Sequence, residues 1–257
     1  MAAELTLQPV ARRGRAGGFR NLLRNELAAF WGTPTWLIQV GTWLVFGPGF
    51  LLLFLLTESL GAGQDGRAPR AAIELAARVL PATAGTLVAI AAVILAQGKI
   101  VGEKQSGTAA WVLSKPVSRS AFVLAKFLAL GSGMVATAVA VQGAGAYAIA
   151  AVADGPAPLV PYLAALVALA VQVLFYLALA LLLGTVFRSR NPVIAIPLLL
   201  LFVMAQWLGS FELSAVAGAL LAEGTVPAEA LVVMAAYALL TVGLLGAAIR
   251  RFGREEF

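Results

Sequence analysis

The sequence of 257 residues contains no cysteine and no histidine. Their absence excludes disulfide bonds, thiolate nucleophiles, imidazole bases and the two most common transition-metal ligands. No paired carboxylates offer a catalytic arrangement in their place, which argues against a membrane enzyme. The phosphate-binding pattern G-x-x-x-x-G-K-[ST] is also missing, so the chain lacks the loop with which P-loop ATPases hold ATP.

Charge is scarce as well. Charged residues make up 12% of the chain and hydrophobic residues 61%, whereas a water-soluble domain carries roughly a quarter charged residues. A bilayer is crossed by about 20 apolar residues in a helix. Six runs reach or approach that length: residues 36–56, 79–97, 121–153, 159–187, 192–208 and 231–249. The sequence therefore predicts an all-α integral membrane protein with six transmembrane helices in one domain, residues 19–257.

The basic residues are distributed unevenly between the two sides of such a bundle. All 18 lysines and arginines except Arg67, Arg70 and Arg78 lie before the first run, after the second run or at the start of the third, after the fourth run, or in the tail. By the positive-inside rule, both termini are then cytoplasmic, in a cell (inner) membrane. The opposite side carries Glu58, Asp65, Glu74, Asp154, Glu212, Glu223 and Glu229. Because the basic residues form several short clusters and no single patch, nucleic-acid binding is not indicated.

No charged residue lies near the middle of a run, and the polar residues at that depth are Gln39, Gln142, Gln172 and Gln206. Ion-coupled carriers usually keep an intramembrane carboxylate, so this pattern argues against a secondary transporter. The glutamines are interpreted as hydrogen-bonding links between helices, with a polar substrate path as the alternative. Gly47-Pro48-Gly49 interrupts the first run and should kink it.

Four segments are neither spans nor plain loops. Residues 1–18 are basic and expected to be flexible, and residues 19–31 are expected to form an amphipathic helix at the membrane interface. Its apolar side comprises Phe19, Leu22, Leu23, Leu27, Phe30 and Trp31; packing on a soluble partner is the alternative. Residues 209–228 predict a re-entrant or interfacial segment on the outer side. Residues 68–80 are expected to form a short surface helix.

The loop between the second and third runs, residues 99–119, is less polar than a solvated loop should be. A short helix at about residues 106–113, ending before Pro116, would present Trp111 and Leu113 on an apolar face. An apolar, cationic helix on the cytoplasmic side needs a surface to dock into. That surface is either a partner protein or the ends of the chain's own helices.

At this loop the sequence resembles the permease subunit of a type-2 ABC exporter. The family pattern has an acidic residue, Gly-Thr, an apolar run ending near Leu-Ser, a proline, Ser-Arg and a later lysine. It is matched by Glu103, Gly107-Thr108, Leu113-Ser114, Pro116, Ser118-Arg119 and Lys126. The expected topology agrees over essentially the whole chain.

The resemblance implies a permease that pairs with a second copy or a similar permease. It implies a separate cytoplasmic ATPase subunit, which would bind ATP and Mg while this chain binds no cofactor. The coupling segment would seat in the ATPase through Gly102, Glu103, Gly107, Thr108, Trp111, Leu113, Lys115, Pro116 and Arg119.

Within the coupling segment, Glu103 is expected to pair with a basic residue of the ATPase, with Lys104 or with Arg119. Thr108 is expected to cap the short helix, and Trp111 and Leu113 to be the buried anchors. The alternatives to an exporter are a membrane assembly protein without a transport cycle and a secondary transporter or channel. The substrate is left open, although the apolar spans favour an amphiphilic or apolar one over a small ion.

Overall fold

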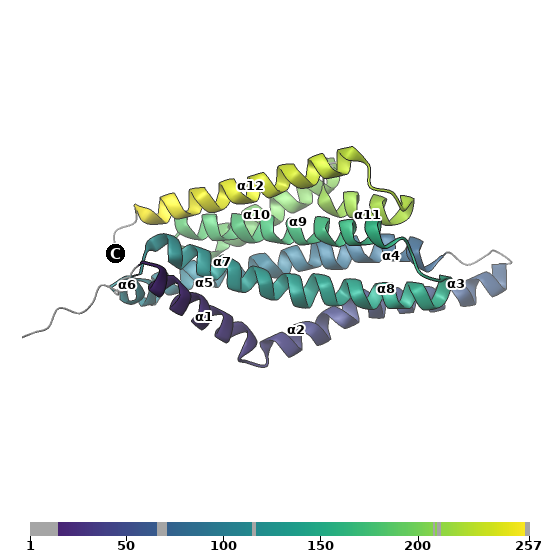
Figure 1. Cartoon of the computed structure of the whole chain (residues 1–257), viewed down its shortest axis with the longest axis horizontal. Helices are drawn as coiled ribbons and strands as arrows, with labels where there is room; N and C mark the ends of the chain where they lie inside the picture. Colours follow the sequence, from purple (N-terminus) through teal and green to yellow (C-terminus); the bar gives the residue numbers. More distant parts are fainter. Residues whose placement is uncertain (1–14, 66–70, 115–116, 208, 210–211, 255–257) are drawn as a thin grey trace, which may run out of the picture.

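The computed structural model describes residues 15–65, 71–114, 117–207, 209 and 212–254, and throughout these residues the regular structure is helical (Figure 1). Six of the helices are long and apolar enough to cross a membrane. They are Thr35–Gly61, Ala72–Gln105, Arg119–Asp154, Leu159–Val186, Arg190–Trp207 and Ala228–Gly253. Each contains or overlaps one of the predicted runs, which confirms the number of candidate spans. Of the segment expected to be flexible, residues 1–14 lie outside the described residues, and the expectation is wrong for residues 15–18, which begin the helix Arg15–Trp31.

Each of the first three spans is a helix interrupted by a wider, π-helical turn. The first consists of α2 (Thr35–Leu44), η1 (Val45–Gly49) and α3 (Phe50–Asp65), and the second of α4 (Ala72–Leu80), η2 (Pro81–Leu87) and α5 (Val88–Gln105). The third consists of α7 (Arg119–Met134), η3 (Val135–Ala140) and α8 (Val141–Asp154). Pro48, which has no backbone N–H, lies inside η1 and accounts for the predicted interruption. Because η2 contacts both η1 and η3, the wide turns lie together inside the bundle.

The expected surface helix at residues 68–80 is wrong for the described part of that range. Residues 72–80 form α4, which continues through η2 into α5 as the first half of the second span. Its apolar side chains Leu75, Ala76 and Leu80 are buried, whereas Glu74 and Arg78 lie on its exposed face. Glu74 and Arg78 therefore mark the exposed side of a helix whose other side is packed inside the bundle.

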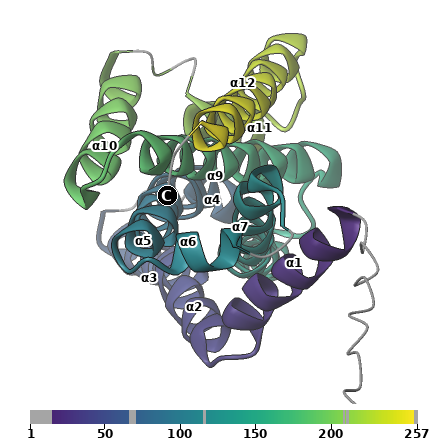
Figure 2. The same ribbon diagram turned by 90° about the vertical axis from the view of Figure 1, so that its left-hand side faces the viewer.

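The remaining helices are α1 (Arg15–Trp31), α6 (Thr108–Leu113), α9 (Leu159–Val186), α10 (Arg190–Trp207), α11 (Leu213–Glu223) and α12 (Ala228–Gly253). Helix α9 lies in the middle of the bundle and contacts α5, α7, α10, α11 and α12 (Figure 2). The second, third and fourth spans supply most of the core, while the first, fifth and sixth expose most of their apolar side chains. Such surfaces fit lipid or other membrane helices.

The two ends of the bundle differ in charge. We call one the basic end, on the left in Figure 1; there α6 lies close to the ends of α5, α9 and α12. It carries Lys99, Lys104, Arg119, Arg188 and Arg250. We call the other the acidic end, where α8 ends at Asp154 and α11 ends at Glu223.

Helix α11 lies inside the bundle and does not cross it. It contacts α4, η2 and α9, and it begins next to Glu212, which accepts a hydrogen bond from Gln172 near the midpoint of α9 (2.8 Å). Its end is near the start of α9, because a Cβ at Gly224 would lie 3.8 Å from Pro158. Helix α11 therefore runs from mid-bundle to the acidic end.

Candidate functional site at the basic end

The short helix α6 bridges α5 and α7 across the basic end (Figure 2). Ala109 is fully buried and Val112 packs against the core, three residues further along on the same face. Trp111 points the other way and is 62% exposed. The helix thus attaches to the bundle by one face and presents an indole on the other.

The turn into α6 depends on Gly107, whose φ of +73° is rarely adopted by residues with a side chain. Gly107 occupies the N-cap position, and its carbonyl accepts the N–H of Trp111 at 3.2 Å. The expected capping role of Thr108 is therefore wrong: Thr108 is the first helical residue, and its hydroxyl lies 2.9 Å from that of Ser106. The side chain of Leu113, and all of Lys115 and Pro116, lie outside the described residues.

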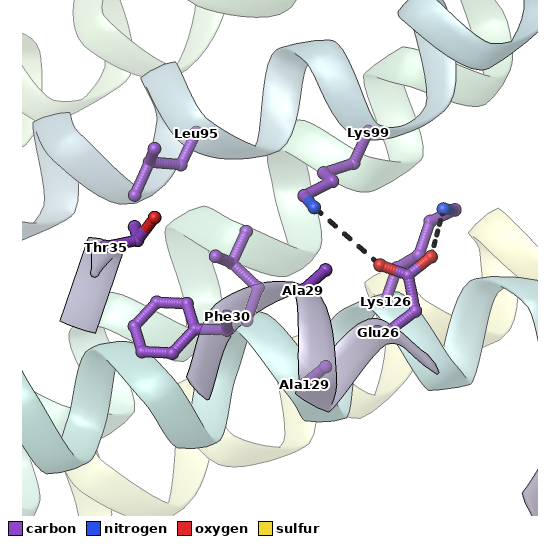
Figure 3. A pocket seen from close by; sticks show the side chains of 9 residues that line it. Glu26, Ala29, Phe30, Thr35, Leu95, Lys99, Lys126 and Ala129 are labelled. Atoms are coloured by element: carbon purple, nitrogen blue, oxygen red, sulfur yellow. Dashed lines mark hydrogen bonds and ion pairs between the residues drawn. The ribbon is translucent and has the colours of Figure 1, made fainter. Parts of the chain in front are cut away.

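An ion-pair cluster joins α1 to α5 and α7, the two helices that flank α6; Figure 3 shows the part of it formed by Glu26, Lys99 and Lys126. The Lys126 ammonium on α7, whose side chain is 1% exposed, donates to a carboxylate oxygen of Glu26 on α1 at 2.5 Å and also to Glu103 on α5. Lys99 approaches the second oxygen of Glu26 at 3.7 Å and is 37% exposed. One buried cation therefore joins α1, α5 and α7 through two carboxylates.

The aromatic ring of Phe122 adds to this attachment. Lys126 lies 4.5 Å from the centre of that ring, a distance at which a cation is attracted to the ring face. Phe122 in turn stacks on Phe252 near the end of α12, with 5.0 Å between the ring centres. The cluster is thus continuous with the last span.

The partner of Glu103 differs from those expected within the chain: it is Lys126. Lys104 instead donates to the carbonyls of Gly184 and Thr185, at 3.2 and 3.1 Å, where the end of α9 attracts a cation. Arg119 donates to the carbonyl of Gly253 at the end of α12, at 2.7 Å. Both flanks of α6 are therefore tied to other spans.

Helix α1 shows the predicted amphipathic pattern, since Arg20 and Arg24 are exposed. On its other side Phe30 is 7% exposed, Trp31 is 39% exposed, and three side chains are half-buried: Phe19, Leu23 and Leu27. The apolar side packs on α7, where Gly133 leaves the space that the Phe30 ring fills: a Cβ there would lie 2.6 Å from the ring. The contact of this helix with the chain's own bundle was not predicted.

A pocket of about 180 Å³ opens beside the cluster, between α1, α2, α5 and α7. Lys99, Glu26 and Lys126 lie along one side, and Phe30 and Leu95 lie on the opposite, apolar side (Figure 3). Ala129 and Leu130 complete the apolar lining. Drug-sized ligands occupy pockets of roughly 300–1,000 Å³, so this one suits a small group. Among the described residues there is no group of three or more Asp or Glu that could hold a metal ion.

Sequence reasoning missed Glu26 as a site residue and quoted Lys126 only as part of the motif. A signal was present for both. Glu26 falls at the helical spacing of Leu22, Leu23 and Phe30, within the apolar side of α1. A charge within an apolar stripe indicates a buried partner.

A second polar cluster lies at mid-bundle around Glu212, which is 5% exposed. The carboxylate accepts hydrogen bonds from Gln172 (2.8 Å) and from Ser214. The buried hydroxyls of Tyr176 and Tyr237 are close enough to interact with it electrostatically. The expectation that Glu212 belongs to the outer side is thus corrected, because α11 carries it to the middle of α9. Because the Glu212 carboxylate lies at mid-bundle, the argument against a secondary transporter, which relied on a lack of such carboxylates, no longer holds.

The glutamines behave differently from one another. Gln172 links α9 to the residue preceding α11, as predicted for a link between helices. Gln39 accepts from the indole of Trp43 on its own helix, at 2.6 Å. Gln142 is fully buried against Gly47, and neither amide atom has a hydrogen-bond partner in the described part of the chain.

In a comparison with known protein families, residues 57–242 match the family described as ABC-2 family transporter protein. The match covers most of the chain, from the first span to the last, and includes α6 with both of its flanks. No curated protein shows significant similarity to the chain.

Proposed function

The chain belongs to the ABC-2 family of transporter membrane proteins, and we propose that it is the permease of an exporter driven through α6 by a separate ATPase subunit. The match confirms the predicted family, and permeases of this family work with an ATPase partner in general. The proposal adds the direction of transport, the docking element and the orientation in the membrane. ATP and Mg are bound by the partner.

The proposal depends on one observation, the two-faced attachment of α6. Its inner face, with Ala109 buried, fixes the helix to the bundle, and its outer face leaves Trp111 62% exposed. Energy in protein interfaces is concentrated in a few residues, and tryptophan is prominent among them. Trp111 is therefore the proposed anchor of the ATPase contact.

The contacts of α6 supply a route for mechanical force. A push on α6 acts on α5 and α7, between which it is mounted, and Glu103 and Lys126 hold these helices together and to α1. Lys104 passes the displacement to the end of α9, and Arg119 to the end of α12. These charge-assisted bonds are stronger than neutral ones, so the basic end moves as a unit.

The orientation follows from charge. With the basic end in the cytoplasm, the exposed α6 faces the ATPase, both termini are cytoplasmic, and Asp154 and Glu223 face outward. Helix α1 then lies at the inner interface, and α11 is re-entrant from the outer side. A second permease copy or a similar chain covers part of the exposed apolar surface of the first, fifth and sixth spans.

Co-purification with the cognate ATPase tests the docking proposal. Trp111→Ala should reduce the ATPase retained per permease at least tenfold, and Trp111→Asp should abolish it. Trp207→Ala is the matched control, since Trp207 is an equally large residue, 82% exposed, at the end of α10. Undiminished retention by both Trp111 variants would refute the assignment, and so would equal losses in Trp111→Ala and Trp207→Ala.

Cysteine labelling tests the orientation, because the chain contains no cysteine of its own. Single replacements Ser114→Cys at the basic end and Ala222→Cys near the end of α11 are both at exposed positions. In intact cells a membrane-impermeant maleimide should label only Ala222→Cys, and cell lysis should add Ser114→Cys. Labelling of Ser114→Cys in intact cells would reverse the proposed topology.

A further inference from the structure

A cleft of about 400 Å³ separates α11 from α12 at the acidic end. Its walls are apolar: Ala215, Val216, Ala219 and Leu220 from α11, and Ala230 and Val233 from α12. The volume lies within the range of roughly 300–1,000 Å³ that is usual for small-molecule sites. It is more than twice the volume of the pocket beside the ion-pair cluster of Glu26, Glu103 and Lys126.

Two carboxylates line the same cleft. Glu223 is the last residue of α11, and Glu229 lies in the first turn of α12; both are exposed. The unpaired carbonyls at the end of α11 carry partial negative charge, so Glu223 adds a full negative charge where the helix is already negative. The combination attracts a cation more strongly than a carboxylate on an open surface.

Arg78, a basic residue of the neighbouring helix α4, does not lie on the cleft side of α11. Helix α4 packs on the side of α11 that faces away from the cleft, since a Cβ at Gly218 would lie 3.0 Å from the carbonyl oxygen of Ala77. The cleft residues Ala215 and Ala219 lie on the other side of that helix. The cleft therefore combines apolar walls with a negative rim.

We infer that this cleft binds amphiphilic cations, with the alkyl part along the apolar walls and the cationic head at Glu223 and Glu229. This inference rests on the proposed function, and it names cationic amphiphiles as the substrate class that the exporter carries. Apolar walls alone would suit the acyl chain of any lipid. The two carboxylates give the cleft a preference for the sign of the head group.

Amphiphiles with matched tails test the inference on the full-length permease in nanodiscs of zwitterionic lipid. The probes are dodecyltrimethylammonium, dodecyl sulfate and dodecyl maltoside, each competing with a fluorescent cationic amphiphile. The trimethylammonium compound should bind at least tenfold more tightly than the other two. In the Glu223→Gln/Glu229→Gln variant this preference should disappear, while the affinity for the maltoside remains. Ala219→Trp, which fills the cleft, should weaken all three.

Glu74→Gln is the matched control, because it removes an exposed carboxylate from α4 at the same end of the bundle. It should leave the preference unchanged. Equal affinity of the wild-type protein for all three probes would show a cleft filled by lipid without selection and would overturn the inference. A cation preference that persists in the double variant would do the same. Because binding is measured without the ATPase, this test still applies if the co-purification experiment refutes the role of Trp111 in docking.

Discussion

Lys126 supports the sharpest test of how the basic end is held together. Its ammonium is buried between Glu26 and Glu103, and Lys126→Met keeps the length of the side chain while removing the charge. The substitution removes the cation between two carboxylates that are 13% and 26% exposed, and leaves Glu26 with the more exposed Lys99 at 3.7 Å. Removal of one partner from a buried ion pair destabilises a protein by about 3–5 kcal/mol.

Lys99→Met is an internal control, since Lys99 approaches the same carboxylate at 3.7 Å but is 37% exposed. Exposed ion pairs contribute about 0–1 kcal/mol. For chains of roughly this size, 1 kcal/mol corresponds to about 2–4 °C in Tm, so Lys126→Met should lower the Tm by about 6–20 °C and Lys99→Met by at most about 4 °C.

The assay is thermal unfolding in a mild detergent, followed by the fluorescence of the five tryptophans. A triple variant, Lys126→Met with Glu26→Gln and Glu103→Gln, should regain most of the lost stability, because no unpaired charge remains buried. If Lys126→Met and Lys99→Met unfold within 2 °C of each other, the cluster does not hold α1, α5 and α7 together.

Three further substitutions probe other contacts. Gly133→Ala should destabilise the protein by about 1–3 kcal/mol in thermal unfolding, since the added Cβ overlaps the Phe30 ring. Adding Phe30→Leu should relieve the clash and restore stability, and a failure to do so would show that α1 does not pack at this position. Glu212→Leu should lower stability by about 1–3 kcal/mol for each buried donor left unpaired, and Glu212→Gln by less; equal effects would argue against the hydrogen bonds. Gly107→Ala should destabilise the turn into α6 by about 1–2 kcal/mol, because alanine disfavours the positive φ of this residue. The variant should also stimulate the ATPase less than the wild-type permease does, and full stimulation would show that this turn is not needed for coupling.

The spans were predictable because the length and hydropathy of a helix are local properties of the sequence. The interruption at Pro48 was predictable for the same reason, as proline acts on its own turn. Residues 72–80 were assigned incorrectly because Glu74 and Arg78 break the apolar run. The sequence does not show that these two share one exposed face while Leu75 and Leu80 are buried by neighbouring helices.

The candidate site was predictable only as far as its motif extends. The family pattern identified Glu103, and the apolar character of the loop identified Trp111, which is exposed at the basic end. It did not identify Glu26, whose partner Lys126 is 100 residues away in the chain, nor the position of Glu212 beside α9. Such pairings depend on how helices pack, and a single sequence does not encode that in any local pattern.

The attachment of α1 also has a consequence for biosynthesis. Glu26 leaves the ribosome 100 residues before Lys126, an interval of about 5–20 s at typical rates of synthesis. Helix α1 is therefore made first but reaches its final place only after the third span has been inserted. Until then its apolar side must rest on the membrane surface or on a chaperone, and a nascent chain that stops before Lys126 keeps its first helix undocked.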